Sequence, residues 1–316
     1  MTDLMTKILP ANSAGFQNAT AFWRDGGLVA FPTETVYGLG ADARNDLAVA
    51  KIFEAKGRPH FNPLIVHVAS AQIAQRYVQW SEEADRLAAT FWPGPLTLVL
   101  PIKPQAGLSH LVTAGLTTLA IRVPAHPVAK SLLTLFDGPI AAPSANPSGK
   151  ISPTEAAHVK AGLFGKIDAI LDGGACDVGL ESTIIGLTDT PTLLRPGGLP
   201  LEALEAALGN ALIQHGNDDP VTAPGQMTSH YAPATGVRLN VITPQKHEVF
   251  LGFGSVECDL NLSQAGDLRE AAANLFQYLH RLDAMQAEGI AVSPIPETGL
   301  GLAINDRLKR AAAPRD

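Results

Sequence analysis

The chain has 316 residues, 46% of them hydrophobic and 17% charged, and its 30 acidic and 23 basic side chains give a formal charge of −7. This composition excludes a disordered chain and weighs against a protein that grips a nucleic-acid backbone over a broad basic surface. Two distant cysteines, Cys176 and Cys258, favour neither a disulfide framework nor a zinc site.

Helix and strand patterns alternate over the first two thirds of the chain. Asn45 or Asp46 is expected to cap the second helix, and Gly57 to end it. Hairpin-like spacing near 180–195 predicts that the sheet is mixed rather than purely parallel. The pattern predicts helices over 13–25, 47–56, 71–91, 127–136, 153–164 and 200–208, and extended segments over 28–31, 36–43, 64–69, 96–102, 117–123, 138–143, 168–172, 181–187 and 192–195.

After Gly209 the pattern gives way to a stretch rich in Pro, Gly, Asn and Asp, which is typical of a linker. A smaller α/β pattern follows, with strands over 237–242, 248–254 and 290–295 and helices over 267–288 and 301–313. We therefore expect a large domain over 1–210, a linker or lid over 211–236 and a small domain over 237–316. We expect neither a signal peptide nor a membrane helix, which needs about 18 apolar residues, and we place the protein in the cytoplasm.

The segment KGRPHFNPLIVH, residues 56–67, carries two cations on a loop stiffened by prolines. Lys56 and Arg58 suit phosphate there, Lys as a point charge and Arg as a two-pronged donor. The ordinary alternative is a helix C-terminus where both cations answer the helix dipole. His67 falls in an apolar strand, where a lone histidine is more often a core residue than a ligand.

Three further features could belong to a ligand site, but each is weak evidence when taken singly. FPTETVYGLG places hydroxyl and carboxyl groups at strand ends, and APSANPSGKISP places Ser144, Asn146 and Gly149 before a helix, where backbone N–H groups can cradle phosphate; both are also common as plain turns. Arg122 and Arg195 lie near the ends of apolar strands, so each needs an anion, either an internal carboxylate or a substrate. The familiar nucleotide, metalloprotease and hydrolase motifs are missing, so any nucleotide is held by a nonstandard cradle.

Seven motifs occur in a fixed order: FPTETVYGLG, KGRPHFNPLIVH, FWPGPLTLVL, TTLAIRVP, APSANPSG, ESTIIGL and LLRPGG. Together they closely resemble the YrdC-like domain of threonylcarbamoyl-AMP synthases. The later PGQMTSHYAP and GLGLAINDRLKRAA resemble the two-domain Sua5 type. The resemblance implies an α/β fold, with a twisted mixed sheet flanked by helices and a small C-terminal α/β domain.

The resemblance also implies a reaction in which L-threonine, bicarbonate and ATP give threonylcarbamoyl-AMP and pyrophosphate. The product would feed the t6A modification at position 37 of tRNA through transferase machinery of the TsaD/TsaB/TsaE type. Mg2+ is expected to arrive with ATP, without metal ligands from the protein, and contact with tRNA is allowed but not required. Carried across motif by motif, the implied catalytic residues are Lys56 and Arg58, the ATP contacts are Arg58, Asn62, Thr118, Ser144, Asn146, Ser152, Arg195 and Tyr231, and the threonine contacts are Thr35, His67, Arg122, Ala142 and Ser182.

Two alternatives stay open at this point. An RNA-binding protein could use the same basic concavity without ATP turnover, although the acidic net charge argues against it. A carbamoyl-adenylate protein of hydrogenase maturation could share the fold, although its acylphosphatase and zinc-finger segments are missing from this sequence.

Overall fold

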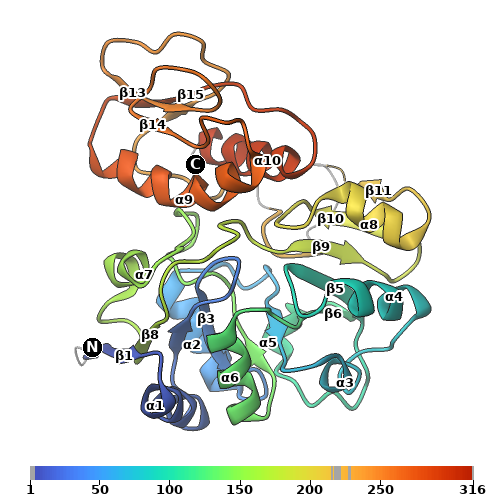
Figure 1. Ribbon diagram of the computed structural model, residues 1–316. Coiled ribbons are helices and arrows are strands. Elements are labelled where there is room, and N and C mark those ends of the chain that lie inside the picture. Colours follow the sequence, from blue (N-terminus) through green and yellow to red (C-terminus); the bar gives the residue numbers. More distant parts are fainter. Residues whose placement is uncertain (1–3, 215, 217–221, 227–228, 315–316) are drawn as a thin grey trace.

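A computed structural model of the chain describes residues 4–214, 216, 222–226 and 229–314, which fold into a large N-terminal domain and a small C-terminal domain. In Figure 1 the C-terminal domain, coloured orange to red, lies over one side of the N-terminal domain, and its helices α9 and α10 face that domain. The described part of the predicted linker leads from one domain to the other, and the predicted linker range also includes residues 215, 217–221 and 227–228, which lie outside the described residues.

The N-terminal domain interleaves short strands with helices, as the alternating pattern predicts. Its elements are β1 (Lys7–Pro10), α1 (Ser13–Arg24), β2 (Val29–Phe31), β3 (Gly38–Asp42), α2 (Asp46–Lys56), β4 (Ile65–His67), α3 (Ala71–Ala74), α4 (Glu82–Phe91), β5 (Leu96–Pro101), α5 (His110–Thr113), β6 (Thr118–Arg122), α6 (Pro127–Phe136), β7 (Ile140–Ala141), α7 (Ala156–Leu163), β8 (Ala169–Asp172), β9 (Thr183–Gly186), β10 (Thr192–Arg195), α8 (Leu201–Leu208) and β11 (Ile213–Gln214).

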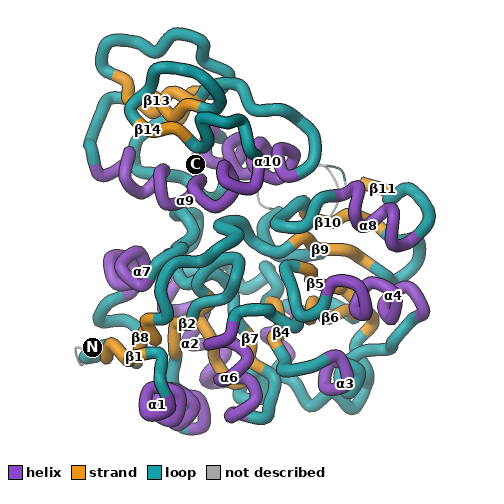
Figure 2. The backbone as a smooth tube through the Cα atoms, in the orientation of Figure 1, coloured by secondary structure: helices purple, strands orange, loops and turns teal. Residues whose placement is uncertain are grey.

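These strands form one sheet of 11 strands among the described residues, in the order β1-β8-β2-β3-β7-β4-β6-β5-β9-β10-β11. The sheet contains parallel pairs, such as β4 with β6, and antiparallel pairs, such as β5 with β6, so the prediction of a mixed sheet is confirmed. Helices lie on both sides of the strands, as Figure 2 shows with strands in orange between purple helices.

The register of the central strands brings distant segments to one edge of the sheet. His67 at the end of β4 pairs with Arg122 at the end of β6. Arg122 also pairs with Thr97 of β5, and β5 in turn runs parallel to β9, which begins one residue after Ser182. Three predicted ligand contacts from three separate motifs therefore lie at the same edge.

Local chemistry explains where the helix that carries the first cations begins and ends. The Asn45 side chain accepts a hydrogen bond from the N–H of Ala48 and caps α2, as predicted. Gly57 follows with φ 61°, a left-handed conformation that glycine adopts without strain. The N–H of Arg58 then bonds the carbonyl of Phe53, and the chain turns away from the helix axis at the residue that carries the guanidinium.

Trp23 lies at the centre of one of the cores that hold the helices on the sheet. Its ring is fully buried and meets Phe31 and Phe136 edge to face, each with ring centroids 5.5 Å apart, and its Nε1 donates to the carbonyl of Gly40 at 2.9 Å. This arrangement joins α1, α6 and the sheet, and the indole N–H keeps a partner although it is buried.

In its described residues the C-terminal domain has a four-stranded parallel sheet, ordered β12-β15-β13-β14, with helices packed against it. Its hydrophobic core includes Val36, Ile151 and Leu180 from the N-terminal domain, so buried apolar contacts run from one domain into the other. Its elements are β12 (Val237–Arg238), β13 (Glu248–Gly252), β14 (Leu260–Asn261), α9 (Leu268–Ala284), β15 (Gly289–Val292) and α10 (Leu300–Ala312).

Several predicted boundaries were wrong. The helical pattern over 71–91 does not continue through residues 75–81: it forms two helices, because Ser81 caps a new helix and Val78 between them forms an antiparallel bridge with Ile102. The strand expected over 237–242 stops at Arg238, shortly before Asn240 adopts φ 56°. The short elements β1, α5, β11 and β14 were not predicted, since two to four residues carry little periodicity.

Candidate active site

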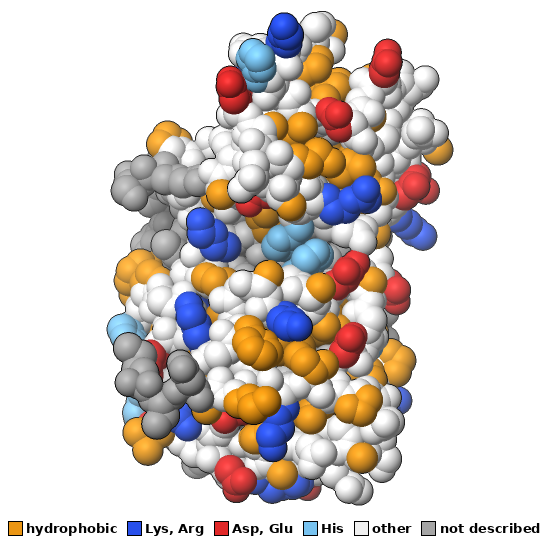
Figure 3. Space-filling model, turned by 90° about the vertical axis from the view of Figure 1, so that its left-hand side faces the viewer, with side chains coloured by type: hydrophobic (Ala, Val, Ile, Leu, Met, Phe, Trp, Pro, Cys, Tyr) orange, Lys and Arg blue, Asp and Glu red, His pale blue; other side chains and the backbone are white. Residues whose placement is uncertain are grey.

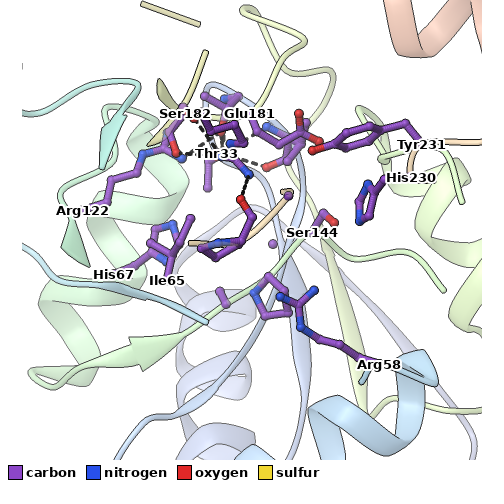
Figure 4. Close-up of a pocket in the computed structure, with 18 residues that line it drawn as sticks. Thr33, Arg58, Ile65, His67, Arg122, Ser144, Glu181, Ser182, His230 and Tyr231 are labelled. Carbon is purple, nitrogen blue, oxygen red and sulfur yellow. Dashed lines mark hydrogen bonds between the residues drawn. The ribbon is translucent and has the colours of Figure 1, made fainter. Parts of the chain in front are cut away.

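A cavity lies at the shared edge of the sheet, between the strand ends and four residues of the segment that joins the domains, Pro224, Gly225, His230 and Tyr231 (Figure 4). In the close-up, Arg122 and His67 lie on one side and Tyr231 and His230 on the other, with Ser144 between them and Arg58 below. The cavity is lined by Thr33, Thr35, Val36, Gly38, Arg58, Ile65, His67, Arg122, Ala142, Pro143, Ser144, Glu181, Ser182, Arg195, Pro224, Gly225, His230 and Tyr231.

Arg122 is the centre of the first half of the cavity. Its Nη2 donates to Glu34 at 2.5 Å, its Nη1 to the hydroxyl of Thr35 at 2.9 Å and its Nε to the carbonyl of Gly94 at 3.1 Å. The ion pair is buried on both sides. Arg122 therefore has the internal carboxylate that sequence reasoning left open, and one N–H of each terminal nitrogen remains for a ligand.

His67 adds a neutral polar group beside Arg122. Burial and the charge of Arg122 lower its pKa to about 3, so the ring is uncharged at neutral pH. Within the described residues its Nδ1 has no hydrogen-bond partner although the side chain is 3% exposed. A buried unpartnered nitrogen facing a cavity is suited to a hydrogen bond with a small polar ligand.

Ser182 and Ala142 complete this half. The Ser182 hydroxyl shares a hydrogen bond with Thr97 at 2.7 Å, and the N–H of Ala142 donates to the carbonyl of Ile65 at 2.9 Å. All five predicted threonine contacts thus line one part of the cavity.

The second half of the cavity holds buried cations. Arg58 is 7% exposed and donates to the carbonyls of Asn62 and Pro63, and burial is the main cause that lowers its pKa to about 10. Arg195 is 4% exposed and donates to the carbonyls of Ser182 and Pro224. Within the described residues neither guanidinium forms an ion pair with a carboxylate, so this side of the cavity is electrostatically suited to an anion.

Lys56 lies next to this cluster but does not line the cavity. Its ammonium donates to the carbonyl of Ser144 at 2.6 Å and to the carbonyl of Asn146. Burial, followed by the positive charge of Arg58, lowers its pKa. Lys56 therefore orders the loop that presents Ser144, while Arg58, two residues on, faces the cavity itself.

The remaining predicted nucleotide contacts lie outside the cavity wall. The Asn146 amide donates to the carbonyls of Pro147 and Lys150, both at 2.8 Å, and Ser152 is fully buried with its hydroxyl on Glu181. Asn62 is buried beneath Arg58. Thr118 begins the strand that Arg122 ends, and four residues of extended chain separate them by about 13 Å.

Tyr231 closes the cavity from the inter-domain segment. Its ring is 1% exposed, stacks on Phe276 with centroids 5.5 Å apart, and has φ 61°. Gly225 lies opposite with φ 85°, and a Cβ there would come within 2.9 Å of the Tyr231 hydroxyl. The described part of this segment is therefore built around one aromatic ring, with a glycine where no side chain fits.

Sequence reasoning missed Glu34, Glu181, Thr33 and His230. Glu34 and Glu181 lie inside two of the motifs quoted above, and the only signal was that a nearby Arg needed an anion. His230 precedes Tyr231 and packs edge to face on it, with centroids 4.0 Å apart. Burial lowers its pKa to about 3.

The described residues offer neither a protein-built metal site nor a membrane-spanning helix. They contain no group of three His, Cys, Asp or Glu side chains arranged to hold a metal ion. None of the helices they form is both long enough and apolar enough to span a membrane.

The fold and the site place the chain first in a broad class. The family model of the Sua5, YciO and YrdC proteins, described as "Telomere recombination", matches residues 21–197. A solved structure of E. coli YciO shares the fold, with a TM-score of 0.56 and 24% identity over 61% of this chain and 96% of that one.

The more specific assignment comes from the whole chain. A second family model, described as "Threonylcarbamoyl-AMP synthase, C-terminal domain", matches residues 199–313. Curated threonylcarbamoyl-AMP synthases are 46% identical in Pyrococcus abyssi, with 94% of each chain covered, and 42% identical in Bacillus subtilis, with 98% of this chain and 96% of the relative covered. The crystal structure of P. abyssi Sua5 complexed with L-threonine has a TM-score of 0.90 and 42% identity over 97% of this chain and 98% of that one.

The chain belongs to the threonylcarbamoyl-AMP synthase family in its two-domain Sua5 form, and it is an enzyme of the nucleotidyltransferase type. The predicted family and α/β fold are confirmed. The alternative of an RNA-binding protein without turnover is not favoured.

Proposed function

We propose that this enzyme joins L-threonine, bicarbonate and ATP into threonylcarbamoyl-AMP, with release of pyrophosphate. One observation carries the proposal: two different half-sites adjoin in one cavity. The half around Arg122 offers a few hydrogen-bonding groups, enough for one amino acid. The half around Arg58 and Arg195 has buried guanidinium groups that, within the described residues, pair with no carboxylate. An amino acid and a polyphosphate are the ligands that such a pair of half-sites suits. The relative from P. abyssi was crystallised with L-threonine.

In this assignment the threonine carboxylate meets the two remaining N–H groups of Arg122. Thr35, His67, Ser182 and the backbone of Ala142 contact the rest of the amino acid. Because His67 stays neutral, it contributes a hydrogen bond rather than a charge. The amine, once carboxylated by bicarbonate or CO2, is then a carbamate whose oxygen points toward the cationic half.

The carbamate oxygen attacks the α-phosphorus of ATP, a new P–O bond forms, and pyrophosphate leaves with the electrons of the broken P–O bond. A carbamate is already an anion, so this step needs no strong general base. Positioning and neutralisation of the phosphate charge dominate, as in other phosphoryl transfers. We assign these roles to Arg58, Arg195 and Ser144, with Lys56 fixing the loop that holds Ser144.

We propose that Asn62, Thr118, Asn146 and Ser152 support or extend the nucleotide site, and that Tyr231 covers it. We also propose that Mg2+ enters with ATP, since the carboxylates nearest the cavity, Glu34 and Glu181, are already engaged by arginines. The ion would neutralise phosphate charge, while the protein groups orient the two substrates.

The product is an acyl adenylate, so a downstream transferase must consume it. We propose that the acceptor is the t6A machinery of the TsaD/TsaB/TsaE type, acting on tRNA position 37. Because ATP and tRNA are cytoplasmic, we place the reaction there.

The test is mass-spectrometric detection of threonylcarbamoyl-AMP after incubation with ATP, threonine and bicarbonate. Omission of any one substrate should abolish the product, and serine in place of threonine reports how strictly the cavity selects the amino acid. Steeply salt-dependent RNA binding without product would refute the proposal.

A further inference from the structure

The C-terminal domain places one buried guanidinium against the rim of the cavity. Arg307 lies on α10 and is 0% exposed, and its Nε donates to Glu181 Oε2 at 2.8 Å. Glu181 lines the cavity, whereas Arg307 lies behind it. The contact joins residues 126 positions apart and crosses from one domain to the other.

Glu181 connects this guanidinium to the nucleotide half of the cavity. Its other oxygen accepts from the hydroxyl of Ser152 at 2.5 Å. The next residue, Ser182, accepts from Arg195 Nη2 through its carbonyl at 2.8 Å. The Glu181 carboxylate thus joins Arg307 to the hydroxyl of Ser152 by hydrogen bonds, and its charge also acts on Arg195 without a direct ion pair.

Arg307 also holds the residue that covers the cavity. Its guanidinium carbon lies 5.1 Å from the centroid of the Tyr231 ring, a cation–π distance. Phe276 of α9 stacks on the same ring, so Tyr231 contacts two side chains of the C-terminal domain. Within the described residues, Nη2 of Arg307 has no hydrogen-bond partner, although the side chain is completely buried.

The ion pair between Arg307 and Glu181 affects the charge of the cavity. A buried carboxylate beside a polyphosphate site would repel the substrate. Burial alone would raise the pKa of Glu181, but the charges of Arg307 and Arg195 together with the hydrogen bonds hold it below its usual range. Without Arg307, the carboxylate would draw Arg195 toward itself, and a cation would be lost from the cavity.

We propose that Arg307 is a positioning residue for the nucleotide: by neutralising Glu181 and holding Tyr231, the C-terminal domain sets the charge and the shape of the ATP half of the active site. The inference rests on the proposed function, and it predicts a defect confined to ATP. The threonine half has its own ion pair, between Arg122 and Glu34, so a change at Arg307 should leave threonine binding unchanged.

The experiment compares Arg307→Met, Arg307→Lys and Glu181→Gln, together with the Glu181→Gln/Arg307→Met double variant, in pyrophosphate release. We expect Arg307→Met to raise KM for ATP tenfold or more, with KM for threonine within threefold of wild type. Arg307→Lys keeps the charge and should recover part of the loss. The double variant should bind ATP better than Arg307→Met, because the carboxylate that needed neutralising is gone.

Lys309→Ala is the matched control. Lys309 lies on the same helix, and among the described residues its ammonium makes one exposed ion pair, with Glu297. Both KM values of this variant should stay at wild type. Thermal melting of each variant reports folding, and Arg307→Lys keeps the test informative where Arg307→Met does not fold.

The proposal is overturned if Arg307→Lys and Arg307→Met change KM for ATP and KM for threonine equally. It is also overturned if the effect of either variant adds to that of Glu181→Gln. Both results would mean that Arg307 only stabilises the contact between the domains. Calorimetry with a nonhydrolysable ATP analogue separates this failure from failure of the proposed function. Wild type that binds the analogue but makes no threonylcarbamoyl-AMP would overturn the function, whereas equal analogue affinity in wild type and Arg307→Met would overturn the role of Arg307.

Discussion

Replacement of Arg122 by Lys should selectively weaken binding of threonine. The guanidinium has five N–H groups, of which Glu34, Thr35 and the carbonyl of Gly94 occupy three. The remaining two, one on each terminal nitrogen, can meet both oxygens of a carboxylate. Lysine keeps the charge but loses this planar fork.

The magnitude follows from those two contacts. A hydrogen bond to a charged group contributes about 1.5–3 kcal/mol, so two are worth about 3–6 kcal/mol at most. The lysine ammonium retains part of this attraction, which leaves a loss of about 2–4 kcal/mol. At about 1.4 kcal/mol per factor of ten, Kd for threonine should rise about 30- to 1,000-fold.

Calorimetric titration with L-threonine measures the effect directly. Arg86→Lys is the matched control, because Arg86 is exposed and its one ion pair in the described part of the chain is with Glu83 on the same helix. Affinity for a nonhydrolysable ATP analogue, measured without threonine, should change less than threefold in Arg122→Lys. A folded Arg122→Lys protein whose threonine affinity lies within threefold of wild type would refute the assignment of the carboxylate to Arg122.

Three further outcomes are expected. Lys56→Ala or Arg58→Ala should slow threonine-dependent pyrophosphate release about 10- to 1,000-fold, and rates near wild type in both variants would contradict the electrostatic mechanism. Tyr231→Ala should weaken retention of ATP, and unchanged nucleotide affinity would leave a covering role without support. Burial and the neighbouring His158 lower the pKa of His280 to about 4, so the unfolded chain takes up a proton first as pH falls from about 6.5 and stability should drop by roughly 1–3 kcal/mol toward pH 4. The drop should be smaller in His280→Gln, and an identical pH dependence of denaturant unfolding in both proteins would contradict it.

This histidine pair lies where the two domains meet. The rings of His158 on α7 and His280 on α9 stack with centroids 3.9 Å apart, and Nε2 of His280 lies 3.2 Å from the carbonyl of Ser152. Figure 3 shows histidine side chains gathered at mid-height on one face of the molecule, where the upper and lower parts join. The contact exists only in the docked arrangement of α7 and α9, so its titration reports on the domain interface.

The sequence sufficed for features that depend on local chemistry. Asn45 as a cap and Gly57 as a helix end follow from side-chain type alone, and both are confirmed. The central strands follow from their β-branched and apolar runs. The very short strands do not, because two residues pair only when their neighbours in the sheet are already in place.

The candidate site was predictable as a set of residues but not as a set of contacts. The resemblance brought Arg58, Ser144 and Arg122 to one site, and all three line one cavity. Lys56 belongs to the same sequence motif as Arg58, yet its ammonium does not line the cavity and donates to backbone carbonyls behind the lining residues. A single residue, Gly57, separates Lys56 from Arg58, and its left-handed conformation turns the chain between the two cations.

The buried arginines show why the charge partners of a side chain cannot be predicted from the sequence alone. A guanidinium is costly to bury alone, so the sequence predicts an anion for Arg122 and for Arg195 without saying which anion, and it gives no such signal for Arg307. The structure divides these arginines into two groups. Arg122 pairs with Glu34, and Arg307 pairs with Glu181 and Asp306. Within the described residues Arg58 and Arg195 meet no carboxylate, only backbone carbonyls and, for Arg195, the hydroxyl of Ser182. A buried arginine that pairs with an internal carboxylate is already neutralised and holds neighbouring groups in place. A buried arginine without such a carboxylate can be neutralised by an anionic ligand. The unpaired arginines therefore mark the end of the cavity where the phosphates should lie, and the paired ones mark the scaffold that keeps that end open.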